Sequence, residues 1–242
     1  MKRYFIGDLH GSKKALDSVF NKIDIENNEV YFMGDYIDRG ANSKEVLETL
    51  KKLTEENENV FCLLGNHDKM LIDFVANGDN LGFLNDPNLN TLKSIFEKKL
   101  YFDGRFDIFD ENSKNITKEL RLKLLHNPLY LWLLERPYFL QTNKQIIVHA
   151  GVDKLLNNWM DTDLEDMIWV RPNTNIKNNT GKDIIVGHTI TSKFIKPKEN
   201  EQPQIYISSQ GNEYYIDTAN FLYDNARILE YNIDTDKYSI ID

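Results

Sequence analysis

Cysteine is almost absent from this chain: Cys62 is the single one among 242 residues. A lone cysteine cannot form an intramolecular disulfide, and its position inside the apolar run 60–64 predicts a buried core thiol rather than a nucleophile. The chain also lacks the stretch of about 18 apolar residues that a membrane-spanning helix requires. Its first motif begins at Gly7, which leaves no room for a signal peptide. We therefore expect a cytoplasmic protein without a membrane partner.

Basic residues are outnumbered, with 29 Lys and Arg against 38 Asp and Glu and a net charge of -9. Nucleic-acid binding normally draws on a basic patch, so this balance disfavours a nucleic-acid partner. Clustered carboxylates are hard oxygen ligands and fit a divalent-metal protein. A hydrophobic content of 41% and a charged content of 28% are ordinary for a globular chain. We expect a single domain that spans residues 1–242.

Five short apolar runs predict buried strands, because each is too short for a helix and is closed by glycine or a polar residue. They cover residues 4–6, 30–33, 60–64, 145–148 and 184–186. Helical patterns lie between them at 12–23, with Ser12 as the N-cap, and at 43–53. The alternation predicts an α/β fold, in which ligands collect beyond the carboxyl ends of the strands.

Residues 69–143 have a different character, with helix-like patterns and no ligand-like motif. We predict a helical insertion here that caps one side of the site. It carries His126, which has no partner at metal-ligand spacing and is expected at the surface or at a helix end. After Pro203, four further runs at 204–207, 213–216, 227–233 and 238–241 predict strands of a second sheet or of the far edge of the first.

Polar residues of the metal-ligand type follow the predicted strands. Asp8 and His10 are two apart, so an extended backbone points them the same way, and the flanking glycines permit a tight turn. Asp35 is placed to be shared between two cations, which would lie roughly 3.5 to 4 Å apart. Mixed oxygen and imidazole ligands suit Mn, Fe, Zn or Co better than Mg or Ca alone. We predict two divalent ions, Mn before the others, held by six residues: Asp8, His10, Asp35, Asn66, His149 and His188.

Two arginines and a histidine suggest what the metals act on. The planar guanidinium groups of Arg39 and Arg171 can each hold two phosphate oxygens. His67, paired with Asp38, would be an imidazolium able to protonate a leaving oxygen. Asp68 is expected only to brace this turn. These roles predict catalysis on a phosphate group.

The motifs that carry these residues resemble those of the calcineurin-like metallophosphoesterases, within the phosphoprotein phosphatase branch of bacterial and phage serine/threonine phosphatases. They are Gly7–Gly11, Gly34–Gly40, Gly65–Asp68, His149–Gly151, Trp169–Arg171 and Gly187–Thr189. The resemblance implies a four-layer sandwich of two mixed sheets flanked by helices.

The resemblance also implies a role for each matching residue. The first metal would be held by Asp8, His10 and Asp35, and the second by Asp35, Asn66, His149 and His188. The phosphoryl group would be bound by Arg39, Arg171 and Asn66. The general acid would be His67 with Asp38.

Two departures leave the substrate open. Protein phosphatases usually carry Glu after the Asn-His pair, whereas Asp68 resembles diadenosine tetraphosphate hydrolases. The family often shows Ile-Asp-Thr-Gly near the C-terminus, and here Ala219 follows Ile216–Thr218.

We expect a phosphoester hydrolase, first of all a serine/threonine-phosphatase-like phosphomonoesterase that uses a metal-bridging hydroxide for in-line attack. Its partner would be a phosphorylated protein or a small phosphoester. The alternative is a dinucleoside polyphosphate hydrolase. A cyclic-nucleotide or nucleic-acid phosphodiesterase is disfavoured by the acidity, and a non-catalytic phosphate-binding scaffold is disfavoured because it would need no proton donor.

Overall fold

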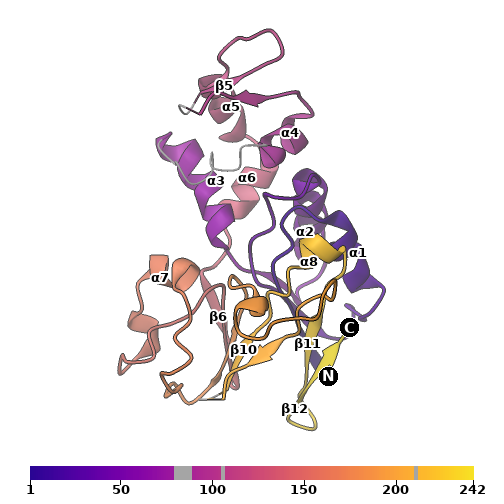
Figure 1. The fold of residues 1–242 in the computed structure, drawn as a ribbon, viewed down its shortest axis with the longest axis vertical. Helices are drawn as coiled ribbons and strands as arrows, with labels where there is room; N and C mark the ends of the chain where they lie inside the picture. Colours follow the sequence, from indigo (N-terminus) through magenta and orange to yellow (C-terminus); the bar gives the residue numbers. More distant parts are fainter. Residues whose placement is uncertain (79–88, 105–106, 210–211) are drawn as a thin grey trace.

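Two five-stranded sheets form the body of the molecule in the computed structural model, which describes residues 1–78, 89–104, 107–209 and 212–242 (Figure 1). The first sheet has the order β12-β11-β1-β2-β3, with β1 (Lys2–Ile6), β2 (Glu29–Phe32), β3 (Val60–Cys62), β11 (Ile228–Asn232) and β12 (Lys237–Ile241). The second has the order β6-β7-β8-β10-β9, with β6 (Phe139–Gln141), β7 (Gln145–Val148), β8 (Asp183–Val186), β9 (Tyr206–Ile207) and β10 (Glu213–Tyr215).

In each sheet three adjacent strands run parallel, and the other two join through antiparallel pairing. β1, β2 and β3 are parallel neighbours, as are β7, β8 and β10. The five predicted strands are β1, β2, β3, β7 and β8; the bounds of β7 match the prediction and those of the other four differ by one or two residues. Beyond polar residues at the starts of β1, β2, β7 and β8, their side chains are apolar on both faces, as expected of parallel strands covered on both sides. The predicted α/β fold of two mixed sheets is therefore confirmed.

The C-terminal runs divide between the two sheets. β11 and β12 pair with each other and extend the first sheet beside β1, whereas β9 and β10 belong to the second. The run predicted at 204–207 forms a strand only at Tyr206–Ile207. The sequence left open whether these runs belong to a second sheet or to the far edge of the first, and the structure contains strands in both positions.

The core lies in layers. Phe5 and Tyr31 point into the space between the sheets, where they join Ile147 and Ile185 of the second sheet in one buried cluster. Alternate residues such as Ile6 pack against the helices on the other face. The outer face of the second sheet is covered by the segment 152–167. Helices therefore flank the sheet pair.

Helices α1 (Lys13–Phe20) and α2 (Ser43–Glu56) cover the first sheet. The Ser12 hydroxyl accepts a hydrogen bond from the backbone nitrogen of Ala15 at 3.1 Å, which confirms the predicted N-cap. α1 ends at Phe20, three residues before the predicted Ile23, because Asn21 caps it. α2 runs three residues beyond the predicted Leu53.

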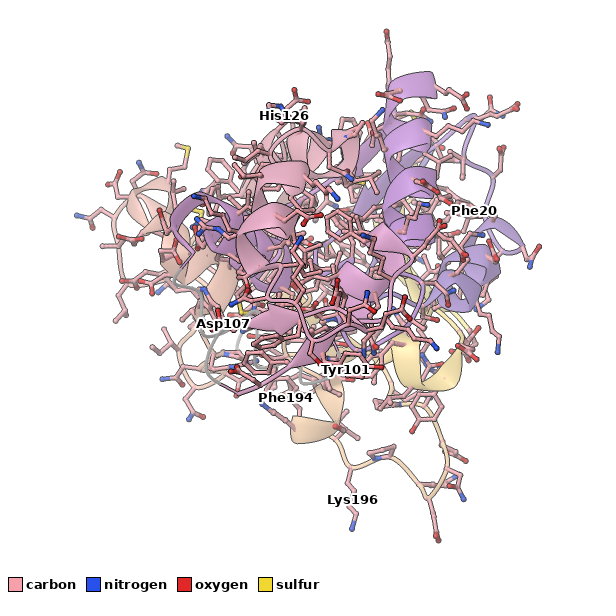
Figure 2. The ribbon with its side chains drawn as sticks, turned by 90° about the horizontal axis from the view of Figure 1, so that it is seen from above. Phe20, Tyr101, Asp107, His126, Phe194 and Lys196 are labelled. Carbon is pink, nitrogen blue, oxygen red and sulfur yellow. The ribbon has the colours of Figure 1, made fainter. Side chains whose placement is uncertain are left out.

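The part of the chain predicted as a helical insertion stands above the ends of the strands (Figure 1). It contains α3 (Asn66–Asn77), α4 (Asn90–Phe96), α5 (Thr117–Leu124) and α6 (Pro128–Leu134), and also the hairpin β4 (Tyr101–Phe102) and β5 (Ile108–Phe109). Residues 79–88 and 105–106 of it lie outside the described part. The helical prediction is wrong at its end, because β6 pairs with β7 in the second sheet. His126 is exposed between α5 and α6, as Figure 2 shows.

Two short helices complete the described structure, α7 (Leu164–Trp169) and α8 (Asn220–Tyr223), together with single 3₁₀ turns at Trp159–Asp161 and Thr191–Lys193. Among the described residues, no helix has both the length and the apolar character needed to cross a membrane.

Candidate metal centre and active site

The loops after β1 and β2 are fastened to each other by backbone hydrogen bonds. The backbone nitrogens of Leu9 and His10 donate to the Asp35 carbonyl at 3.2 and 2.9 Å, and that of Gly11 donates to the Tyr36 carbonyl at 2.8 Å. Parallel strands end at one edge of the sheet, so these loops meet there. The two motifs are thereby locked together.

Several of the predicted site residues have backbones in the left-handed region. The φ angles are +43° at His10, +54° at Asp35, +69° at Asp38, +62° at Arg39 and +60° at His188. This conformation is uncommon for residues other than glycine and concentrates at functional sites, where surrounding contacts hold it. The site is therefore a preformed and mildly strained arrangement.

Glycine is required where loops approach closely. A Cβ on Gly65 would overlap the backbone nitrogen and Oδ1 of Asp35. A Cβ on Gly187 would overlap Oδ1 of Asp8. These two glycines let the loops after β3 and β8 press against the carboxylates.

Asp35 lies at the centre of the predicted ligands. Its Oδ2 is 3.6 Å from Nε2 of His10, and its Oδ1 is 3.5 Å from Nε2 of His149. Candidate ligand atoms lie within 4.8 Å of one another in two groups, His10 with Asp35 and His67, and Asp35 with His149 and His188. Asp35 is common to both groups.

Asp8 and Asn66 complete the set. Oδ2 of Asp8 is 3.8 Å from Nε2 of His10. Oδ1 of Asn66 is 3.0 Å from Nε2 of His149 and 2.8 Å from Nδ1 of His188. All six predicted metal-binding side chains therefore converge.

Three buried polar atoms of this set make no hydrogen bond within the described residues: Oδ2 of Asp8, Nε2 of His10 and Nε2 of His188. Buried polar atoms are normally paired, and each unpaired one costs about 1 to 3 kcal/mol. Cations coordinated by these atoms would remove that cost. The residues present fit a centre of two divalent ions.

The histidine rings are oriented by their other nitrogens. Nδ1 of His10 lies 2.9 Å from the Ile37 carbonyl, and Nδ1 of His149 lies 2.7 Å from the Met33 carbonyl. Metal-binding histidines are usually held in this way, because the second nitrogen donates to a carbonyl and fixes the ring. Both Nε2 atoms then face Asp35.

The electrostatics suit metal ligands. Burial lowers the pKa of His10 well below its usual value, so its imidazole is neutral. Burial would raise the pKa of Asp35, but His149 and His67 outweigh it and hold that pKa well below the usual range. Asp35 is therefore ionised.

His67 and Asp38 form the expected pair beside this centre. Nδ1 of His67 is 2.8 Å from Oδ2 of Asp38. Burial would lower the pKa of His67, but the Asp35 charge and the hydrogen bond to Asp38 raise it overall. The hydroxyl of Thr91, on α4, donates a hydrogen bond to Oδ1 of Asp38. The same hydroxyl accepts a hydrogen bond from the backbone nitrogen of Asp38 at 3.0 Å. Thr91 was not predicted from the sequence.

The two arginines lie on different sides of the centre. Nη2 of Arg39 is 3.5 Å from Nε2 of His67, and its guanidinium lies 5.1 Å from the centroid of the Phe221 ring. Nη1 of Arg171 donates to the His188 carbonyl at 3.3 Å. Both arginines are exposed at the site.

Asp68 braces the loops, as expected. Its Oδ2 accepts from the backbone nitrogens of Asp35 at 2.8 Å and Gly65 at 3.0 Å, and its Oδ1 accepts from Tyr36 at 3.1 Å. Because Asp68 is fully buried, its carboxylate is not accessible from the surface and serves to hold the backbone of these loops.

The segment after Ile216 also adjoins the site. Asp217 is buried with Oδ2 unpaired among the described residues, and the amide of Asn220 donates to the Asp8 carbonyl at 3.2 Å. Ala219 has φ +56°, a conformation that the glycine usual at this position would adopt without strain. The sequence marks Ala219 as a departure from the family pattern, but it predicts neither the buried carboxylate of Asp217 nor the contact of Asn220 with Asp8.

Sequence comparison bears on this site directly. The model of the calcineurin-like phosphoesterase family matches residues 1–221, which include every predicted ligand. The chain belongs to this family. The predicted family is therefore confirmed. The predicted activity is confirmed at the level that the family gives, a phosphoester hydrolase.

Two curated proteins that resemble this chain share one name. The chain is 28% identical over 211 residues to a symmetrical bis(5'-nucleosyl)-tetraphosphatase of Wigglesworthia glossinidia brevipalpis, which covers 85% of this chain and 61% of that protein. It is 39% identical over 82 residues to a protein of the same name from Buchnera aphidicola, covering 33% of this chain and 28% of that one. The chain thus spans less than two thirds of the length of these relatives.

Solved structures of similar fold carry more varied names. One described as a candidate diadenosine tetraphosphatase has a TM-score of 0.59 at 12% identity and covers 99% of this chain and 92% of its own. A serine/threonine phosphatase from Saccharomyces cerevisiae has a TM-score of 0.57 at 14% identity, and the match covers 100% of this chain and 80% of the phosphatase. At such identities the likeness concerns the calcineurin-like fold alone.

Proposed function

We propose that this calcineurin-like phosphoesterase hydrolyses dinucleoside tetraphosphates symmetrically at a centre of two divalent ions. The observation that carries the proposed chemistry is that Asp35 belongs to two groups of candidate ligand atoms. Buried atoms of Asp8, His10 and His188 in the same set make no hydrogen bond among the described residues. The proposed substrate is supported by the shared name of the curated relatives.

In the proposed centre, Asp8, His10 and Asp35 would hold one ion, and Asp35, Asn66, His149 and His188 would hold the other. Mn is the first choice for these mixed oxygen and imidazole ligands, and Fe, Zn or Co also suit them. When bound, such ions lower the pKa of water and neutralise charge on phosphate oxygens.

The protein's own groups hold the phosphates and supply a proton. Arg39 and Arg171 would bind non-bridging oxygens from opposite sides, and the amide of Asn66 would add a further contact. His67 would donate its Nε2 proton to the leaving oxygen, while Asp38 keeps Nδ1 occupied and the ring oriented. The bond that breaks is the one between phosphorus and that oxygen.

A phosphorylated protein, our first expectation from the sequence, has weaker support than the dinucleotide. The structures of protein phosphatases resemble this chain at 14% identity. A likeness at this level supports a common fold but gives no information about the substrate. The names of the sequence relatives favour the alternative.

The decisive assay supplies Mn and compares diadenosine tetraphosphate, a phosphoserine peptide and p-nitrophenyl phosphate at equal concentration. We expect two molecules of ADP from each diadenosine tetraphosphate and a kcat/KM at least tenfold above that for the peptide. ATP and AMP as products would contradict symmetric cleavage, and preference for the peptide would overturn the substrate.

The matched control is Asp35→Asn, which preserves the shape of the shared ligand and removes its charge. We expect it to lose at least 1000-fold in kcat because one carboxylate serves both ions. Circular dichroism checks that the variant is folded. Wild-type-like turnover by folded Asp35→Asn would refute the two-ion centre.

A further inference from the structure

Trp169 differs from the other two tryptophans of the chain. Trp132 and Trp159 are buried at 5% and 8% exposure, whereas Trp169 is 42% exposed. Its ring meets that of His188 edge-on, with centroids 6.3 Å apart and an interplanar angle of 85°. An aromatic ring that is partly open to water beside a proposed metal ligand is suited to receiving a flat ligand group.

Trp169 and the proposed proton donor lie on different sides of Asp35. Trp169 and Arg171 accompany His188, which belongs to one of the two ligand groups, whereas His67 belongs to the other. On the His67 side, an aromatic neighbour is Phe221 of α8, whose ring centroid is 5.4 Å from that of His10. Figure 1 shows α7, which ends at Trp169, and α8 well apart.

This separation limits which part of a substrate can reach Trp169. The leaving group departs toward His67, because that residue protonates its oxygen. A group at Trp169 must therefore be attached to the attacked phosphorus through one of its other oxygens. A phosphomonoester carries only free oxygens there, whereas a phosphoanhydride chain continues to a nucleoside.

We infer that the exposed face of Trp169 stacks on the nucleobase of the nucleotide that keeps the attacked phosphorus, while Arg171 holds the phosphates between them. The inference rests on the proposed function and adds a base-binding site to it. Base stacking on an aromatic ring tolerates any base, because every base presents a π-face. The site thus selects nucleotides over protein phosphomonoesters without strict choice of base.

Fluorescence tests the site without turnover. Because Trp169 is the exposed member of the three tryptophans, ADP added with Mn should quench the long-wavelength part of the emission. Pyrophosphate, which lacks a base, should leave it unchanged. Trp169→Phe should remove the quench, and Leu155→Ala, at an exposed apolar residue of the segment 152–167, should retain it.

Kinetics test the site during catalysis. Trp169→Ala should raise the KM for diadenosine tetraphosphate about tenfold, within the range that loss of one stacked base gives. It should change kcat/KM for p-nitrophenyl phosphate by less than about twofold, since that aryl group leaves on the His67 side. Inhibition of p-nitrophenyl phosphate turnover by ADP should weaken about tenfold, and inhibition by pyrophosphate should stay the same.

The outcomes separate this inference from the proposed function. If Trp169→Ala cleaves diadenosine tetraphosphate as well as wild type does, the base site is refuted and the function stands. If the variant loses activity on both substrates equally, Trp169 only supports His188 and the base site is refuted. If wild type cleaves only p-nitrophenyl phosphate while ADP still quenches and inhibits through Trp169, the dinucleotide substrate fails and the base site holds.

Discussion

Nδ1 of His67 lies 2.8 Å from Oδ2 of Asp38, across 29 residues of sequence, and this contact joins the first turn of α3 to the loop after β2. It leaves Nε2 of His67 as the nitrogen available to a substrate. His67→Asn should therefore lower kcat at least 100-fold for substrates with poor leaving groups, as expected for loss of a general acid. For p-nitrophenyl phosphate, whose leaving group needs no proton, the loss should stay below about tenfold. Equal losses on both kinds of substrate would assign His67 another role.

The same pair predicts a pH dependence. Burial opposes protonation of His67, but Asp35 and Asp38 raise its pKa overall. The protonated acid is present below that pKa, so kcat for a poor leaving group should fall as the pH rises through it. Asp38→Asn removes one of the raising contributions and should move this fall to lower pH. An unchanged pH profile of kcat in the folded variant would argue that a different group titrates.

Thr91 should influence turnover although it lies on α4, away from the motifs. Its hydroxyl binds Asp38, so Thr91→Val should lower kcat about threefold to tenfold on poor leaving groups, for a loss of about 1 kcal/mol in the hydrogen bond. Thr91→Ser keeps the hydroxyl and should remain within twofold of wild type. A Val variant with wild-type kcat would show that the contact has no catalytic effect.

Metal affinity should rise with pH. Burial would lower the pKa of His149, but Asp35 raises it to about 9, so an incoming ion must displace a proton from this ring. Between pH 6 and 8, the Kd for Mn should fall by up to tenfold per pH unit. Calorimetry in buffers of different ionisation enthalpy measures the proton released. His126→Asn, at an exposed histidine, is the control that should leave the pH dependence intact. A Kd independent of pH would contradict the protonated state of His149.

Cys62 should be inert in the folded protein. It is 2% exposed, and burial raises the pKa of its thiol to about 12. At pH 8 the reactive thiolate is therefore nearly absent, and reagents have no access to it. Ellman's reagent should detect no thiol in the native protein and one per chain in guanidinium chloride. Rapid labelling of native protein would disprove burial.

The residues that could be predicted from sequence share a local signal. Asp8 and Asp35 each follow an apolar run that forms a parallel strand, and such strands bring their carboxyl ends to one edge. His188 could be placed by the same reasoning, although it lies 180 residues from Asp8 in the sequence. In the structure, the backbone nitrogen of His188 donates a hydrogen bond to Oδ1 of Asp8. Strand periodicity carries long-range information when the strands belong to adjoining sheets.

The residues that were missed have no such signal. Thr91 meets Asp38 because α4 returns over the loop after β2, and nothing in its neighbours distinguishes it from other helical threonines. The sequence predicts a helical region where β6 lies, because Phe139–Gln141 is only three residues long. Such a segment is too short to display the alternation of apolar and polar residues that indicates a strand. Its strand form depends on pairing with β7, which is a tertiary effect.

In the mechanism that we propose, the hydrogen bond between Thr91 and Asp38 makes the region above the sheets a component of the proton supply. This region could not be exchanged for another of similar shape as though it were a detachable cover, because the new segment would have to present a hydroxyl at the same place. Descendants of this fold that remodel the region would change which leaving groups they tolerate even with every metal ligand kept. Diversity of substrate could then arise far from the ions themselves.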